Sequence, residues 1–246
     1  MHRFFVPPET FGDNPVRLPE DVVHHLSKVL RMNVGDELLL LDGLGNLARC
    51  CLDGLGKAEA AARVLQRWSE AETAVPLQLI QSLPKGDKMD LILQKGTELG
   101  ITQFSPVTSE RGIRQERDER QAKRRQRWEK IIREAARQCR RPLLPELNDL
   151  QPLVRVLTDC RAALRLLFWE EENQSLPSLL PSKRPDSVAI LVGPEGGFSR
   201  DEATLAQQYG FQPVRLGPRI LRSETAGFAV ASILQYLYGD LGDPGT

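Results

Sequence analysis

The sequence lacks the features of exported and membrane-spanning proteins. No run approaches the roughly 18 consecutive apolar residues of a membrane span, since even the apolar stretch 162–169 contains Arg165. The short apolar stretch at the amino terminus ends at prolines, unlike a secretory signal. Cysteines are few and show neither CxxC spacing nor a disulfide framework (Cys50, Cys51, Cys139, Cys160). We therefore expect free thiols in a protein of the reducing cytoplasm.

Common nucleotide and metal signatures are also missing. GxxxxGK[ST] is absent and no GxGxxG follows the first strand, so a P-loop or a dinucleotide-binding fold is disfavoured. His24 and His25 are adjacent, and adjacent side chains diverge on a helix. No third ligand accompanies them, so we expect no metal site.

The chain has no net charge overall, but positive charge is concentrated in one segment. The chain has 33 basic and 33 acidic residues, so any affinity for nucleic acid must come from a patch. Between Arg111 and Arg141 thirteen basic residues stand against five acidic ones, a net charge of +8. Trp128, Ile131 and Ile132 give this segment an apolar stripe typical of a helix. The segment is a candidate phosphate-binding face, although a solvated charged helix has the same composition.

The first 70 residues are rich in predicted strands and turns. A strand is expected at 37–41 and another over 58–68, with turns at Asp42-Gly43 and at 53–56. The apolar spacing of 19–30 predicts one short helix. Short strands joined by glycine turns favour a small β-barrel, followed by a polar linker at 69–74.

From Val75 onwards strands alternate with helices. Strands are expected at 77–80, 104–108, 162–169, 188–192 and 213–216, and helices at 85–99, 116–139, 201–209 and 224–238. The runs 162–169 and 188–192 are continuously apolar, as in strands buried on both faces. The pattern predicts an α/β domain with a mostly parallel sheet. Residues 175–186 are interpreted as a loop.

Two loops follow predicted strands and lead into helices. The first is Gly193-Pro194-Glu195-Gly196-Gly197-Phe198, with Ser199 as a candidate N-cap. Ligands of open α/β sheets bind at this edge, and glycines let a ligand approach backbone closely. A tight strand-to-helix turn without a ligand would have the same composition.

The second loop runs from Leu216 to Gly227, with Ser223 as a candidate N-cap whose helix start suits an anion. Its alternative interpretation is a capped core helix, with Arg219 and Arg222 as ordinary surface charges.

Together the two loops, 193–198 and 216–226, resemble the cofactor-binding signature of the small-subunit ribosomal RNA uridine-N3 methyltransferases, a family of the SPOUT superfamily. Further matches occur at 3–6, 24–31, 85–88, 94–100, 109–111 and 134–141. Cys139-Arg140 departs from the family pattern, where a small residue and glycine are more usual.

The resemblance implies an α/β fold with two domains. It gives residues 1–70 as a PUA-like β-barrel RNA-binding domain and 75–246 as a trefoil-knotted SPOUT methyltransferase domain. It further implies a homodimer, S-adenosyl-L-methionine as cofactor and 16S ribosomal RNA of the small subunit as partner. The family target is the N3 of uridine 1498.

Chemistry and resemblance together nominate site residues. N3 of uracil must lose its proton before it is methylated, and this loss places negative charge on uracil. Arg222 is therefore predicted to stabilise that charge, and Glu224 to accept the proton or orient the arginine; Glu98 and Arg141 are second choices. The predicted cofactor-binding residues are Leu166, Leu167, Phe168, Gly193, Pro194, Glu195, Gly196, Gly197, Leu216, Gly217, Ile220, Leu221, Arg222, Thr225 and Ala226. The predicted RNA-binding residues are Arg3, Lys28, Arg31, Lys85, Lys88, Lys95, Arg111, Arg124, Arg125, Arg127 and Arg141.

Two other functions fit the same residues. One is a SPOUT enzyme acting on another ribosomal or transfer RNA position. The other is a non-catalytic RNA-binding ribosome factor, which the intact glycine loops disfavour.

Overall fold

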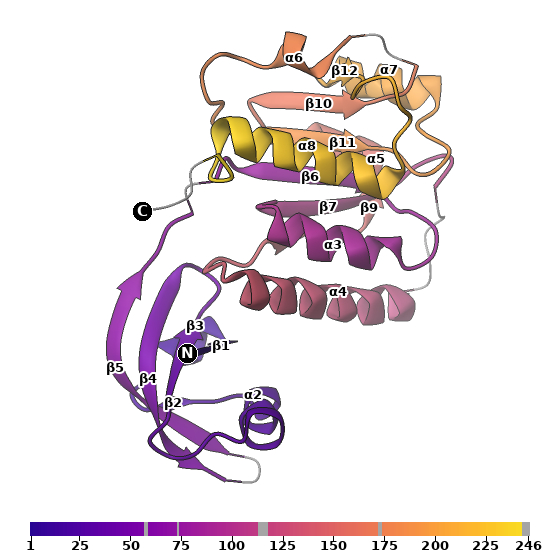
Figure 1. Cartoon of the computed structure of the whole chain (residues 1–246). Helices are drawn as coiled ribbons and strands as arrows, with labels where there is room; N and C mark the ends of the chain where they lie inside the picture. The colour runs from indigo at the N-terminus through magenta and orange to yellow at the C-terminus, as the bar shows by residue number, and fades with distance from the viewer. Residues whose placement is uncertain (57–58, 73, 113–117, 172–173, 243–246) are drawn as a thin grey trace. The chain divides into compact units, whose positions relative to one another are not determined.

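The computed structural model describes residues 1–56, 59–72, 74–112, 118–171 and 174–242. The chain forms two compact units (Figure 1). Unit 1 comprises Met1–Glu72 and Ala136–Leu144, and unit 2 comprises Thr73–Ala135 and Pro145–Thr246. The inclusion of residues 136–144 in unit 1 was not expected from the sequence.

Unit 1 is built on one five-stranded sheet with the order β1-β3-β4-β5-β2. β1 runs parallel to β3 and the other pairs are antiparallel. The strands are β1 (His2–Phe5), β2 (Val16–Arg17), β3 (Glu37–Leu41), β4 (Asn46–Leu55) and β5 (Ala60–Ser69). Because β1 and β2 are the two edges of this path, the predicted barrel is an open, curled half-barrel.

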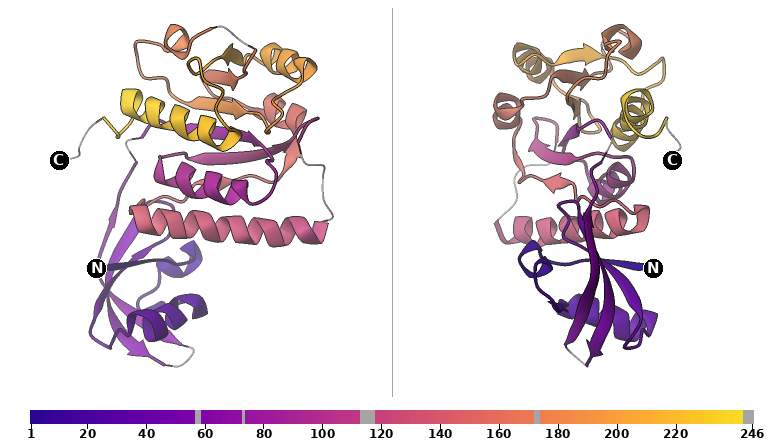
Figure 2. Two further views of the ribbon diagram at one scale, coloured as in Figure 1. Left: turned by 45° about the vertical axis from the view of Figure 1, so that its right-hand side comes forward. Right: turned by 90° about the vertical axis from the view of Figure 1, so that its left-hand side faces the viewer.

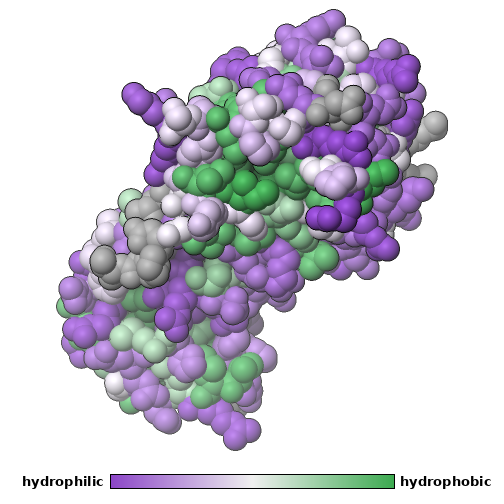
Figure 3. Space-filling model, turned by 45° about the horizontal axis from the view of Figure 1, so that its top comes forward, coloured by the Kyte–Doolittle hydropathy of each residue, from purple (hydrophilic) through white to green (hydrophobic). Residues whose placement is uncertain are grey.

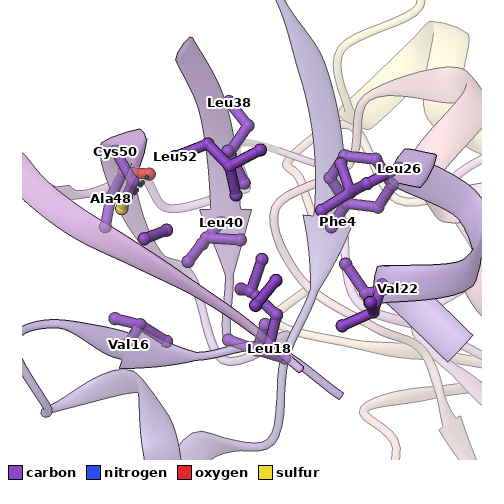
Figure 4. Packing of buried hydrophobic residues seen from close by; sticks show 14 of the residues in the cluster. Phe4, Val16, Leu18, Val22, Leu26, Leu38, Leu40, Ala48, Cys50 and Leu52 are labelled. Atoms are coloured by element: carbon purple, nitrogen blue, oxygen red, sulfur yellow. Dashed lines mark hydrogen bonds between the residues drawn. The ribbon is translucent and has the colours of Figure 1, made fainter. Parts of the chain in front are cut away.

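The continuous apolar sequence of β3 is explained by burial of both faces of this strand. Leu38 and Leu40 face the main core of unit 1, where they pack with Phe4 and Leu26 (Figure 4). Leu39 and Leu41 face a second cluster that includes Ala136. Alternate residues of a strand point to opposite faces, so a strand covered on both faces needs continuous apolar residues. The segment 136–144 therefore supplies part of the cover for the second face.

The helix predicted over 19–30 is present in two parts, α2 (Glu20–His24) and a π-helix (His25–Leu30) that ends at Arg31 in a left-handed conformation with φ of 53°. A short helix α1 (Pro8–Phe11) was not predicted. The turn predicted at 53–56 is wrong in part, because Asp53–Leu55 continue β4 through a bulge next to Gly54. Ala58, the predicted start of the next strand, lies outside the described residues, and β5 begins at Ala60.

Unit 2 contains the predicted parallel sheet. Its order is β12-β10-β11-β6-β7-β8, with β9 also paired to β7, and every pair is parallel. The strands are β6 (Leu77–Ser82), β7 (Gln103–Thr108), β8 (Glu146–Leu147), β9 (Gln151–Pro152), β10 (Leu164–Phe168), β11 (Val188–Val192) and β12 (Gln212–Val214). All five residues of β11 are buried, which confirms its interpretation as an interior strand.

Helices cover both faces of this sheet (Figure 2). Helices α3 (Lys88–Glu98) and α8 (Ser223–Tyr238) lie on one face, and α5 (Leu153–Asp159) and α7 (Arg200–Gln208) on the other. The long basic helix is α4 (Asp118–Cys139), and α6 (Leu176–Leu179) lies within the segment that we had interpreted as a loop. Helix α5 was not predicted, although Leu153, Val156 and Leu157 have helical spacing.

A buried glutamine fixes α8 against the sheet. The Gln235 side chain accepts a hydrogen bond from Val75 N at 3.1 Å and donates to the carbonyls of Val75 and Gly100 at 3.1 and 3.0 Å. A buried amide needs such partners, since an unpaired one costs about 1–3 kcal/mol. These bonds set the position of α8, whose first turn carries residues of the candidate site.

Candidate cofactor site

A cavity of about 330 Å³ opens where β10, β11 and β12 end. Its walls are the strand-end residues Phe168, Val192 and Val214 together with the two glycine-containing loops. The structure thus brings together, at the carboxyl edge of a parallel sheet, the two segments that the sequence singled out. This edge is where ligands of open α/β sheets bind.

The first loop owes its shape to two glycines and a capping box. A Cβ at Gly193 would lie 3.2 Å from the backbone of Gly197 and Phe198, and Gly197 has a φ of 66°. A larger residue would strain both positions. Ser199 is the N-cap of α7, as predicted, and Glu202 completes its capping box.

A buried hydrogen-bond network joins the two loops at the cavity. The Ser223 hydroxyl donates to Gly193 O at 2.5 Å, and Gln81 Nε2 donates to Ser223 Oγ at 2.9 Å. The prediction of Ser223 as an N-cap is wrong: Arg222 is the N-cap residue and makes no side-chain capping bond. The Ser223 hydroxyl instead points to the first loop.

Three charged side chains form a cluster at the cavity. Lys88 Nζ lies 2.8 Å from Glu195 Oε1 and 3.5 Å from Glu224 Oε2. Glu195 also accepts a hydrogen bond from Lys85 N at 3.2 Å. Glu224 Oε2 is buried and has no hydrogen-bond partner among the described residues. Lys88 is therefore the ion-pair partner of one carboxylate from each loop.

The ion pair shifts the pKa of both its members. Burial raises the pKa of Glu195, but the hydrogen bond from Lys88 and two backbone N–H groups outweigh it and leave this pKa below its usual range. The hydrogen bond to Glu195 and the charges of Glu195 and Glu224 raise the pKa of Lys88 above its usual range, against the effect of desolvation. Both groups are thus charged at neutral pH.

The second loop has several exposed side chains. Gly217 has a φ of 71°, and the Arg215 guanidinium donates to Pro218 O at 3.0 Å across the turn. Ile220 is 76% exposed although it lines the cavity. Arg219 and Arg222 also line the cavity and are exposed.

Most of the predicted cofactor-binding residues surround the cavity. Those lining it are Phe168, Gly193, Pro194, Glu195, Gly197, Leu216, Ile220, Leu221, Arg222 and Ala226. Leu166 and Leu167 are buried inside β10, and Gly196, Gly217 and Thr225 are exposed away from the lining. Glu224 does not line the cavity and reaches the cluster through Lys88.

The sequence interpretation missed several residues of the lining. They are Val192, Val214, Trp169, Glu170, Arg215 and Arg219; in addition, Lys88 was predicted to bind RNA and Ser223 to cap a helix. Trp169 and Glu170 directly follow β10, and Arg215 directly follows β12. These three residues would have been predicted if the candidate site had included the residues that follow each strand.

The predicted RNA-binding residues of unit 1 differ in exposure. Lys28 and Arg31 are exposed, and Arg3 donates to Arg140 O at 3.1 Å. Arg141 is largely buried, with an exposed side-chain fraction of 10%, in a two-pronged ion pair with Glu72 at 2.6 and 2.7 Å. Its position favours a structural role.

In unit 2 several of the predicted RNA-binding residues interact with other residues of the chain. Arg125 pairs with Glu129 and Asp149, and Arg127 pairs with Asp87 and Asp90. Arg124 lies over the ring of Trp128, Lys95 pairs with Glu98, and Arg111 donates to Gly196 O. Lys85 is exposed. Arg114 and Arg117, counted in the basic segment, lie outside the described residues.

Within the described part of the chain, no group of three His, Cys, Asp or Glu side chains could hold a metal ion. No described helix combines the length and apolar character needed to cross a membrane.

Comparison with known proteins finds RNA methyltransferases. Family models described as an RNA methyltransferase domain and an RNA methyltransferase PUA domain match residues 71–235 and 18–65. The ribosomal RNA small subunit methyltransferase E of Bacillus subtilis is 34% identical over 223 residues, 87% of each chain. That of Synechocystis sp. is 35% identical over 92% of this chain and 74% of its own.

A solved structure agrees over almost the full length. The ribosomal RNA small subunit methyltransferase E from Neisseria gonorrhoeae, bound to S-adenosyl methionine, is 35% identical and superposes with a TM-score of 0.88. The match covers 98% of this chain and 99% of that one.

Proposed function

Because the chain belongs to the RNA methyltransferase family that carries a PUA domain, we propose that it methylates small-subunit ribosomal RNA with S-adenosyl-L-methionine as the methyl donor. The target, following the family resemblance, is N3 of uridine 1498 in 16S ribosomal RNA. The observation that supports this proposal most is the cavity at the strand ends, which is lined by both glycine loops.

The residues of the cavity fit this cofactor. Apolar walls from Phe168, Val192, Leu216 and Leu221 suit an adenine ring, and the cavity volume of about 330 Å³ lies within the range of small-molecule sites. Glu195 supplies a negative charge suited to the ammonium or sulfonium group. When bound, the cofactor supplies an electrophilic methyl group, and the chain's own residues position the acceptor.

We assign the acceptor chemistry to Arg222 and Glu224. Arg222 is exposed at the cavity, where its guanidinium can stabilise negative charge on the uracil oxygens as the N3 proton leaves. Glu224 offers a buried carboxylate oxygen without a hydrogen-bond partner in the described chain, 3.5 Å from Lys88. We propose that it accepts that proton or orients Arg222, with Lys88 as its counter-ion.

The remaining family properties extend the proposal. Residues 1–70 would bind RNA through Lys28 and Arg31, residues 75–246 would form a knotted catalytic domain, and the enzyme would act in the cytoplasm on the small subunit. A homodimer is supported by exposed apolar residues on and after α8, among them Tyr236 and Leu237, which are 66% and 50% exposed. Figure 3 shows apolar side chains gathered on one face of unit 2.

Cofactor binding can be tested with two neighbouring substitutions. Ala226 lines the cavity, whereas the preceding residue, Thr225, is exposed and does not line it. In Ala226→Leu the added carbons should fill cofactor space, so calorimetry should show at least a tenfold weaker affinity for S-adenosylmethionine. Thr225→Leu should bind within about twofold of the wild type. Equal affinity of all three proteins would place the cofactor elsewhere.

A further inference from the structure

A turn outside the cavity holds the first loop. Residues 109–112 follow β7, and the hydroxyls of Ser109 and Ser82 are in hydrogen-bond contact. From this turn, Arg111 Nη1 donates to Gly196 O at 2.9 Å and Glu110 N donates to Glu202 Oε1 at 2.7 Å. The turn thus contacts both the loop 193–198 and the first turn of α7 that follows it.

Arg111 covers the outer side of the loop. A Cβ at Gly196 would lie 3.6 Å from both Cβ and Cδ of Arg111, so the arginine stem packs against this glycine. Gly196 therefore faces Arg111, and the cavity is lined by its neighbours Glu195 and Gly197.

Glu202 connects the two segments through both of its oxygens. Oε2 accepts a hydrogen bond from Ser199 N at 2.9 Å in the capping box, while Oε1 accepts the bond from Glu110 N. The end of the loop and the start of α7 are thereby tied to the turn 109–112.

Two backbone carbonyls of the loop are held in different ways. Gly193 O is bonded from below by the buried Ser223 hydroxyl, whereas Gly196 O is bonded from the solvent side by Arg111. Holding a binding loop in its bound shape reduces the conformational entropy that a ligand must overcome. The outer hydrogen bond is therefore placed to affect cofactor affinity without contacting the cavity.

We propose that Arg111 is a positioning residue for the cofactor loop, which it fixes through the carbonyl of Gly196; this inference rests on the proposed function. The sequence had suggested a different role for Arg111, a contact to an RNA phosphate. The two roles predict different phenotypes for the same substitutions.

The test uses Arg111→Ala, the conservative Arg111→Lys, and Arg133→Ala as a control that removes one exposed charge from α4. Calorimetry should show that Arg111→Ala binds S-adenosylmethionine roughly 5- to 10-fold more weakly, as expected for the loss of about one hydrogen bond. At saturating cofactor its kcat should stay within twofold of wild type. Arg111→Lys should regain most of the affinity, and Arg133→Ala should bind S-adenosylmethionine as tightly as the wild type.

Amide hydrogen exchange of the ligand-free proteins gives a readout that does not depend on the cofactor. Amides of residues 195–198 should exchange several-fold faster in Arg111→Ala than in Arg133→Ala or the wild type. Unchanged exchange and unchanged cofactor affinity in Arg111→Ala, with weaker binding of 16S ribosomal RNA, would overturn the proposal in favour of a phosphate contact. A wild type that fails to bind S-adenosylmethionine would instead contradict the proposed function, and the exchange result would still decide the role of Arg111.

Discussion

Lys88 links the two loops of the cavity through one ammonium group. It bonds Glu195 of the first loop at 2.8 Å and lies 3.5 Å from Glu224 at the start of α8. The Lys88 side chain is 31% exposed, so solvent partly screens these interactions. Its role is to hold two carboxylates, which would otherwise repel each other, at one side of a binding site.

The pKa shift of Glu195 predicts how this pair depends on pH. Because its pKa is lowered in the folded protein, the pair stabilises the fold above the ordinary carboxylate pKa of about 4.3 and loses that effect as pH falls through the lower folded value. Urea unfolding should therefore show Glu195→Gln less stable than wild type at pH 7, with the difference disappearing in acid.

The matched control is Glu171→Gln. Glu171 pairs with Arg200 at 3.2 Å, but the two side chains are 48% and 83% exposed. Surface pairs contribute little, so this variant should match the wild type at every pH. A difference between Glu195→Gln and wild type that grows in acid would contradict the assignment.

At this scale the sequence predicted residue types better than their partners. Glycines 193 and 197 were expected to shape a loop, and their contacts and dihedral angles show why no larger residue suits them. Ser223 was taken for a helix cap, but its partner is the carbonyl of Gly193, thirty residues earlier. Local patterns cannot reveal a partner that only the tertiary fold supplies.

Helix α4 carries two groups of basic residues, which differ in whether they form ion pairs with acidic residues of the chain. Arg125 and Arg127 are in contact with acidic residues of the same unit. Lys123, Lys130 and Arg133 are exposed on the same helix. Phosphate binding should depend more on the second group, because the first would have to exchange existing ion pairs for new ones.

Salt-dependent binding of 16S ribosomal RNA tests this division. Replacing Lys123, Lys130 and Arg133 with alanine should flatten the log–log salt dependence by up to about three phosphate contacts, each worth a slope of roughly 0.7–0.9. Replacing Arg125 and Arg127 should change the slope less. If neither set alters affinity or slope, α4 is only a solvated face.

The elements of unit 2 followed from the sequence where periodicity was strong. β11 matches the predicted run 188–192 residue for residue, and α7 begins one residue before the predicted start. Prediction failed where tertiary pairing overrides local signals. Gly54 was interpreted as part of a turn. In the structure it pairs with β5 next to a bulge, so β4 continues through this residue.

At the scale of the whole molecule, chain order and spatial units differ. Residues 136–144 are far from residues 1–72 in sequence but belong to the same unit, where Arg141 pairs with Glu72. No composition shift marks this return of the chain. The knotted path implied by the family is a property of the same kind, since no local pattern of residues encodes how a chain threads itself.

The apolar surface of unit 2 predicts self-association. Leu237, on α8, is a large side chain that is 50% exposed. If this face forms the proposed dimer, a charge buried there would be strongly unfavourable. Leu237→Glu should therefore sediment as a monomer.

Val154→Glu serves as the control for this prediction. Val154 has a similar exposure of 46% but lies on α5, on the opposite face of the sheet. This variant should stay dimeric. A dimeric Leu237→Glu protein or a monomeric wild type would remove the support that this surface gives to a homodimer.

The central claim is methylation of one uridine in small-subunit ribosomal RNA. Its most direct test incubates the protein with small ribosomal subunits that lack the modification and S-adenosylmethionine labelled in its methyl group, followed by mass spectrometry of the digested RNA. The account predicts one labelled nucleoside, N3-methyluridine, mapping to position 1498, and at least a hundredfold slower transfer by Arg222→Ala. Label on a ribose, on another base or on another position, or no transfer at all by a protein that binds the cofactor, would contradict it.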